Sequence, residues 1–184
     1  MFTKSATPTA AIAHNTREVF MANYYTDASF IVPLTPEQTE FALKVLQCAT
    51  DDSIDFTKKH KTAAAKQYEP AVFRLAKKLA KAVMDESLEE VCLDFRCEQE
   101  PKGLWISHDE TINTYHAATF THLIMKHFDI DGYIDIQAAH TCNKRRLDAF
   151  GGHAAFITKK EVKWTSTHQW VYQQAKRSGL SPAA

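Results

Sequence analysis

The apolar residues of this chain change their spacing several times along the sequence, between every second position and every third or fourth position. Alternation places apolar side chains on one face of a strand, whereas spacing of three or four residues places them on one face of a helix. Along the chain, the pattern predicts a strand, two helices, two strands, a helix, two or three strands and a final helix. This order indicates an α+β fold, with a four- to six-stranded mixed or mostly antiparallel sheet packed with about four helices.

The first two helices are predicted from their boundary residues and their apolar faces. In TPEQTEFALKVLQCA, Thr35 is placed to cap, Pro36 suits the first helical position and Gln38 completes a capping box. The predicted core face of this helix consists of Phe41, Ala42, Val45, Leu46 and Ala49. In the second helix, which follows Pro70, the predicted core face consists of Val72, Leu75, Ala76, Leu79, Ala80 and Val83.

The third and fourth helices lie in the second half of the chain. The third covers residues 114–128, after capping candidates between Asp109 and Asn113. We expect its inward side to include His116, Phe120, Leu123, Ile124 and His127. The fourth begins at about Thr167 and stops at Gly179, a residue type that commonly ends helices.

Strands are predicted wherever apolar residues alternate or form short runs. SFIVPL at 29–34 is a short strand, and VCLDFRCEQEP at 91–101 alternates as a strand with one solvated face. A turn then leads into GLWISHD at 103–109 as its antiparallel partner. YIDIQAAH at 133–140 alternates again, and residues 153–164 form one long strand or a hairpin.

The length and composition of the chain favour a single domain. The chain has 184 residues, 45% of them apolar, which allows one sizeable core, and we expect the domain to cover residues 25–184. Residues 1–24, rich in Thr, Ala and Ser, are expected to form a flexible arm or a short helix. Lysine plus arginine equals aspartate plus glutamate at 22 each, so the whole chain has no electrostatic preference for nucleic acid or for an acidic membrane.

The sequence favours a cytoplasmic protein that binds no membrane. No segment approaches the ~20 apolar residues that a membrane span needs, and the N-terminal residues lack the apolar core of a signal peptide. The four cysteines, at positions 48, 92, 97 and 142, have none of the short paired spacings of zinc or redox sites. We therefore expect thiols in a reducing compartment, and neither a metal nor a cofactor.

The segment HTCNKRRLDAFGGH, residues 140–153, combines more reactive side-chain types than any other short stretch of the chain. It leaves a predicted strand at Ala139 or His140, carries three consecutive cations and returns through two glycines into the next strand. Glycine lets the backbone turn sharply or pass close to another group. The candidate binding residues are those of this segment and one from another strand end: Thr141, Cys142, Lys144, Arg145, Arg146, Gly151, Gly152, His153 and His108.

The spacing within this segment argues against several standard sites. Its glycines match neither GxGxxG nor GxxxxGK[ST], and it precedes a strand, whereas phosphate-binding loops precede a helix. The chain has no GxSxG sequence, although the cations beside Cys142 could lower the pKa of its thiol. The remaining interpretation is a cationic loop suited to an anionic ligand or a protein partner, with a solvated connection between strands as the alternative.

Two other clusters have simpler interpretations. The run of cations between residues 58 and 81 could attract nucleic acid, but the solvated side of an amphipathic helix explains it as well. His108, Asp109 and Glu110 could supply metal ligands or an acid–base pair, but negative charge before a helix is also typical of capping.

The second half of the chain resembles a group of short uncharacterised bacterial and phage proteins. The resemblance depends on a TCxKxR-like segment, FGG, and an AxFIT-like strand, formed here by Thr141, Cys142, Lys144, Arg146, Phe150, Gly151, Gly152, Ala155, Phe156, Ile157 and Thr158. It covers about half the chain. His153 replaces a third small residue of the group, and the group carries no activity that could be transferred.

The sequence favours a non-enzymatic interaction or regulatory protein of bacterial or phage origin that uses the 140–153 segment to bind its partner, because no complete catalytic constellation is present. One alternative is an enzyme or nucleotide-binding protein whose site joins residues 108–110 to residues 142–146. A second alternative is nucleic-acid binding through the basic face at 58–81.

Overall fold

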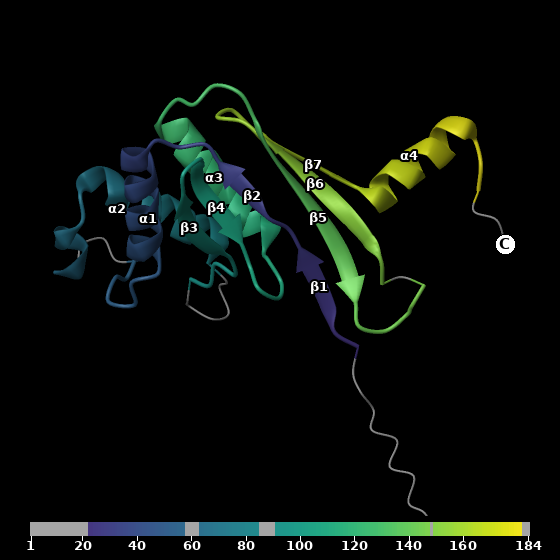
Figure 1. Ribbon diagram of the computed structural model, residues 1–184, viewed down its shortest axis with the longest axis horizontal. Coiled ribbons are helices and arrows are strands. Elements are labelled where there is room, and N and C mark those ends of the chain that lie inside the picture. The colour runs from purple at the N-terminus through teal and green to yellow at the C-terminus, as the bar shows by residue number, and fades with distance from the viewer. Residues whose placement is uncertain (1–21, 58–62, 85–90, 148, 182–184) are drawn as a thin grey trace, which may run out of the picture.

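The computed structural model describes residues 22–57, 63–84, 91–147 and 149–181, and the α+β class is confirmed (Figure 1). In this part of the chain the strands divide between two antiparallel sheets. The four-stranded sheet has the order β1-β5-β6-β7, and the three-stranded sheet has the order β2-β4-β3. The strands are β1 (Tyr24–Asp27), β2 (Phe30–Val32), β3 (Arg96–Glu100), β4 (Gly103–Ser107), β5 (Ile134–Cys142), β6 (Gly151–Ile157) and β7 (Val162–Ser166).

Four α-helices accompany the sheets: α1 (Pro36–Ala49), α2 (Pro70–Val83), α3 (Thr114–His127) and α4 (Thr167–Ser178), with a 3-10 turn at Ala64–Gln67. The predicted capping box of α1 is confirmed, since Thr35 and Gln38 each accept a hydrogen bond from the backbone N–H of the other. The predicted core face of α2 is also confirmed, because all six of its residues are buried.

The predicted inward side of α3 is only partly right. Phe120 and Ile124 are buried as expected, whereas His116, Leu123 and His127 are only partly buried. The buried face is centred instead on small residues, which let the helix approach α2 and the four-stranded sheet closely. Its buried residues are Thr114, Ala117, Ala118, Phe120, Thr121, Ile124 and Met125.

The predicted strand at 91–101 is wrong in its first half. Asp94 has a φ of 51°, in the left-handed region, which interrupts an extended chain. The carbonyl of Asp94 accepts a hydrogen bond from the N–H of Asn113 instead of a strand partner. Strand β3 therefore begins only at Arg96, and it pairs with β4 as expected.

One hydrophobic core joins helices α1 to α3 to both sheets. Its fully buried members include Val45 on α1, Leu79 on α2, Leu104 on β4, Phe120 on α3 and Ile136 on β5. Burying a Leu or Phe side chain of this kind stabilises a fold by roughly 1.5–3 kcal/mol. No helix in the described ranges is long and apolar enough to cross a membrane.

The N-terminal region differs in part from the prediction. Most of the predicted arm, residues 1–21, lies outside the described residues, as do Lys58, Lys59 and Lys61 of the basic run. The strand β1 begins at Tyr24, which is the last residue of the predicted arm. It pairs with β5, so that Tyr24 lies opposite Cys142. Pairing with β1 also explains why β5 continues to Cys142, beyond the predicted end at Ala139 or His140.

The four-stranded sheet has one face on the core and one face open. Ile136, Ala155 and Ile157 point into the core beside α3. Neighbouring residues in β5 and β6, such as Asp135 and Phe156, point to the other side and are exposed. We call this second side the outer face; Figure 1 shows α4 leaving the end of β7 and extending away from the sheet.

Candidate functional site

The 140–153 segment is a β-hairpin connection whose two ends belong to strands. His140 and Thr141 lie in β5, and Gly151 to His153 lie in β6, with His140 opposite Gly151 across the hairpin. Because side chains alternate along a strand, this register places His140 and His153 on the core side and Gly152 on the outer face. The candidate residues are thus divided between the two sides of the four-stranded sheet.

On the core side, three side chains form a hydrogen-bonded chain. The Nε2 atom of His153 lies 2.7 Å from the hydroxyl oxygen of Thr114, and its Nδ1 atom lies 2.6 Å from Nε2 of His140. The ring of Trp164 packs beside His153 at a centroid distance of 5.6 Å. Burial, and to a lesser extent the neighbouring His140, lower the pKa of His153 below its usual value of 6.5.

This chain of groups resembles the order nucleophile, base and orienting group of covalent catalysis. Thr114, however, is only 7% exposed at the first turn of α3, so a substrate could not approach its hydroxyl oxygen. The arrangement instead connects the start of α3 to the β5–β6 hairpin. The glycine-rich end of the hairpin is therefore held in a fixed position relative to the core.

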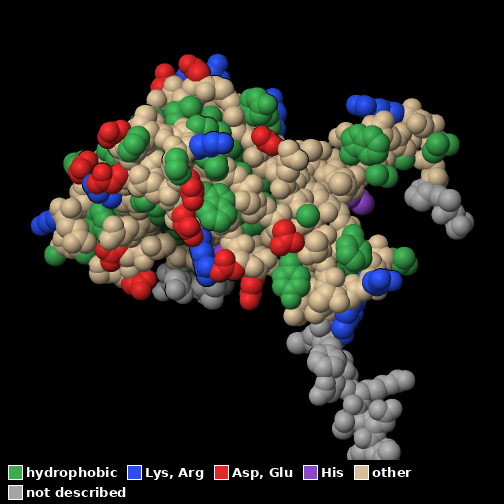
Figure 2. All heavy atoms as spheres, viewed as in Figure 1, with side chains coloured by type: hydrophobic (Ala, Val, Ile, Leu, Met, Phe, Trp, Pro, Cys, Tyr) green, Lys and Arg blue, Asp and Glu red, His purple; other side chains and the backbone are tan. Residues whose placement is uncertain are grey.

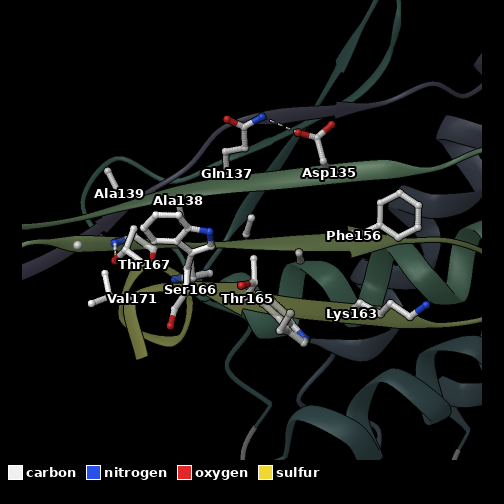
Figure 3. Close-up of a pocket in the computed structure, with 17 residues that line it drawn as sticks. Asp135, Gln137, Ala138, Ala139, Phe156, Lys163, Thr165, Ser166, Thr167 and Val171 are labelled. Carbon is white, nitrogen blue, oxygen red and sulfur yellow. Dashed lines mark hydrogen bonds between the residues drawn. The ribbon is translucent and has the colours of Figure 1, made fainter. Parts of the chain in front are cut away.

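On the outer face lies a groove of about 1060 Å³ between the sheet and the start of α4 (Figure 3). We call it the sheet–helix groove. Its rows follow the strand register: Ala139 with Gly152, then Gln137 with Ala154 and Thr165, then Asp135 with Phe156 and Lys163. Trp170 and Val171 of α4 line the same groove as these rows.

The groove is apolar in its floor and polar at its margins. Ala139, Gly152 and Ala154 have little or no side chain, so the sheet surface is hollow beside Trp170. Figure 3 shows Asp135, Phe156 and Lys163 at the opposite end from Thr167 and Val171. A concave, mostly apolar surface with a few polar groups is typical of a binding site.

Gly152 is required where the backbone comes close to its neighbour. A Cβ atom at this position would lie 2.7 Å from the carbonyl oxygen of Ala138, a distance that real Cβ atoms do not adopt. The hydroxyl of Thr167 accepts a hydrogen bond from the N–H of Gly152 and donates one to its carbonyl oxygen. The expected close approach at the glycine pair is therefore to Ala138 and to the first residue of α4.

Helix α4 is formed by local signals but is not covered by the rest of the fold. The hydroxyl of Ser166 accepts a hydrogen bond from the N–H of Gln169, and Gly179 ends the helix with a φ of 65°. None of the twelve residues of the helix is buried, and Trp170 and Tyr172 are 60% and 63% exposed. In Figure 2, hydrophobic side chains are visible on this projecting part of the molecule.

The cationic loop and the end of β5 are attached by several hydrogen bonds to β1 and to the residue before it. Arg146 donates to the hydroxyl of Tyr24 at 3.2 Å, and the N–H of Asn23 donates to the side chain of Asn143 at 3.0 Å. Thr141 donates to Asp27 at 3.2 Å. Lys144 and Arg145 share this loop with Arg146, away from the rows of the groove.

His108 lies elsewhere in the molecule. Its Nδ1 atom accepts a hydrogen bond from the N–H of Glu110, and the neighbouring Asp109 pairs with Arg96. The imidazole lines a different hollow, beside α1 and β3, with Leu43 among its neighbours. His108 follows β4 of the three-stranded sheet, whereas Cys142 ends β5 of the four-stranded sheet, and the hollow beside His108 is lined by none of residues 142–146.

The basic residues of α2 form a solvated side of that helix. Arg74, Lys78 and Lys81 are exposed, opposite the buried face.

Across the described ranges there is no group of three or more His, Cys, Asp or Glu side chains that could hold a metal ion. Searches found no protein-family model, curated protein or solved structure that matches this chain, so the resemblance of its second half stays a prediction.

Proposed function

We propose that this protein is a non-enzymatic interaction protein that binds a protein segment in the sheet–helix groove. The observation that carries the proposal is the groove itself, an apolar hollow of about 1060 Å³ whose floor of small residues is open to solvent on the outer face. Monomeric proteins seldom expose a large contiguous apolar surface unless something binds to it. The proposal keeps the predicted segment 140–153 in the site through Gly152 on the outer face, whereas the imidazole of His153 lies on the core side.

The side chains that line the groove favour a protein segment as its ligand over a small anion. Phe156 is 42% exposed, and Trp170 is 60% exposed, so both offer aromatic surface to an apolar side chain. Asp135 and Lys163 at the far end offer one charge of each sign, which suits the mixed polar groups of a peptide. The three consecutive cations lie in the connecting loop, where they could add to the attraction of an acidic partner but do not form the floor.

The proposal includes a cytoplasmic location and a bacterial or phage origin. All four cysteines are present as thiols, which is the usual state in a reducing compartment. The origin depends on the resemblance of the 141–158 region to short bacterial and phage proteins.

A selection experiment tests the proposal. A library of random displayed peptides is selected on the full-length protein, and the affinity of each recovered peptide is then measured on the Ala154→Arg variant, which fills the centre of the groove. The expected result is a set of peptides that lose at least about tenfold in affinity on the variant. The matched control is Lys144→Ala with Arg145→Ala. If the selected peptides depend on these cations and not on Ala154, the groove is not the binding surface.

A further inference from the structure

The helix α4 and the outer face are two uncovered surfaces carried by the same chain. Only the first residues of the helix, Thr167, Trp170 and Val171, line the sheet–helix groove. The last two turns, from Tyr172 to Ser178, contribute nothing to it and extend away from the sheet (Figure 1). An isolated helix of about twelve residues is marginal in water, so a covering surface would stabilise this part of α4.

We propose that the covering surface is the outer face of a second copy of this chain, with α4 of each copy seated in the groove of the other. This inference deepens the proposed function, because it uses the same groove and names its occupant. A contact of this kind is self-complementary under a two-fold axis, since each copy offers one helix and one face. The dimer therefore contains two equivalent helix-to-sheet contacts.

The dimensions of the two surfaces match. Helix α4 has twelve residues, which corresponds to a length of about 18 Å. Strand β6, the central strand of the groove, has seven residues and a length of about 23 Å. The apolar side chains available on the last two turns of the helix are Tyr172 and Ala175, and they would meet the small floor residues and Phe156 of the other copy.

The charges also match. Helix α4 carries His168, Lys176 and Arg177 and no acidic residue. On the outer face, Asp135 accepts a hydrogen bond from Gln137, and Lys163 is paired with Glu161 at 2.7 Å. This pair offsets part of the positive charge of Lys163. The carboxylate of Asp135 can therefore attract the cations of a second helix.

A mixing experiment on full-length chains tests this dimer. The Ala154→Arg variant blocks the groove and repels the cationic helix. The Tyr172→Glu variant replaces the aromatic contact surface of the helix by a charged side chain and leaves the groove intact. Sedimentation equilibrium is expected to give a mass twice the 20.8 kDa of the chain for the wild type. Each variant alone is expected to dissociate at least about tenfold more readily.

The mixture of the two variants is the decisive arm. One contact can still form in it, between the intact helix of the Ala154→Arg chain and the intact groove of the Tyr172→Glu chain. A mixed dimer is therefore expected, at least about tenfold tighter than either variant with itself. Tyr115→Ala serves as the control for loss of an exposed aromatic residue outside the groove, and circular dichroism confirms that all variants fold.

Three results would overturn the inference. They are a wild-type chain that stays monomeric, a dimer unaffected by either variant, and a mixture that fails to associate. The proposed function is judged separately, since a monomeric chain that still binds selected peptides through the groove would keep that proposal while removing the second copy as the partner.

Discussion

His140 and His153 are joined by a hydrogen bond of 2.6 Å between their imidazole rings, although thirteen residues separate them in the sequence. His153 is bonded through its other nitrogen to Thr114. A neutral imidazole has one donor and one acceptor nitrogen, so His153 can serve both partners only while the pair is not doubly protonated. Two protonated rings would place donor against donor and charge against charge.

Acidification is therefore expected to destabilise the protein through His153. Folding lowers the pKa of this residue, chiefly by burial and then by His140, so below pH 6.5 the unfolded chain binds more protons than the native one. The stabilisation is complete above pH 6.5 and is lost as the pH falls toward the lower native pKa. Urea unfolding at pH 7.5, 6.0 and 5.0 should show a smaller decline for His153→Gln than for the wild type. An identical decline would contradict this role, and His168→Gln on exposed α4 is the control.

Gly152→Ala is expected to destabilise the fold by about 1–3 kcal/mol, because the added methyl group would force the strand away from Ala138. The neighbouring Gly151→Ala is the matched control. Its Cβ atom would lie 3.2 Å from the side-chain oxygen of Thr167, which can move more easily than backbone. Chemical denaturation measures the free energy of unfolding of both variants. Equal losses of this free energy would show that the close approach to Ala138 is unimportant.

Thr167→Val is expected to loosen the start of α4 at a cost of about 0.5–1.5 kcal/mol in unfolding free energy, because the hydroxyl bonds both polar groups of Gly152. Amide hydrogen exchange at Gly152 and in the first turn of α4 should become faster. Thr165→Val, at a neighbouring exposed position of β7, controls for the loss of a hydroxyl group. Unchanged exchange in both variants would mean that Thr167 does not anchor the helix.

The cysteines are expected to differ in reactivity toward N-ethylmaleimide. Burial raises the pKa of the Cys97 thiol to about 12, so almost none of it is thiolate near neutral pH. Cys92 is exposed and should be modified first, while fully buried Cys48 should be protected. Peptide mass spectrometry after timed labelling measures the order. Rapid labelling of Cys97 in the folded protein would contradict the burial described for it.

Local signals in the sequence predicted the helices well. The capping box at Thr35 and the stop at Gly179 act within a few residues, and the six apolar residues of α2 repeat with the helical period. The face of α3 was harder to predict because it packs on α2 and on a sheet, so small residues are buried in preference to His116 and His127. The left-handed conformation of Asp94 has no signal in the alternating pattern around it.

The candidate site was only partly predictable. The glycines at 151 and 152 indicated a close approach, and the alternation of YIDIQAAH placed Asp135, Gln137 and Ala139 on one side of a strand. Whether that side is covered depends on where α4 lies, and this is decided by contacts between distant segments. The histidine pair depends in the same way on hairpin register, since His140 lies opposite Gly151.

Calorimetric titration of a selected peptide into the wild-type protein and into the Ala154→Arg variant tests the central claim most directly, that the sheet–helix groove is a protein-binding surface. The account expects saturable binding to the wild type and a loss of at least about tenfold in affinity on the variant, with Lys144→Ala binding like the wild type. Equal affinity for the wild type and for a folded Ala154→Arg variant would contradict it.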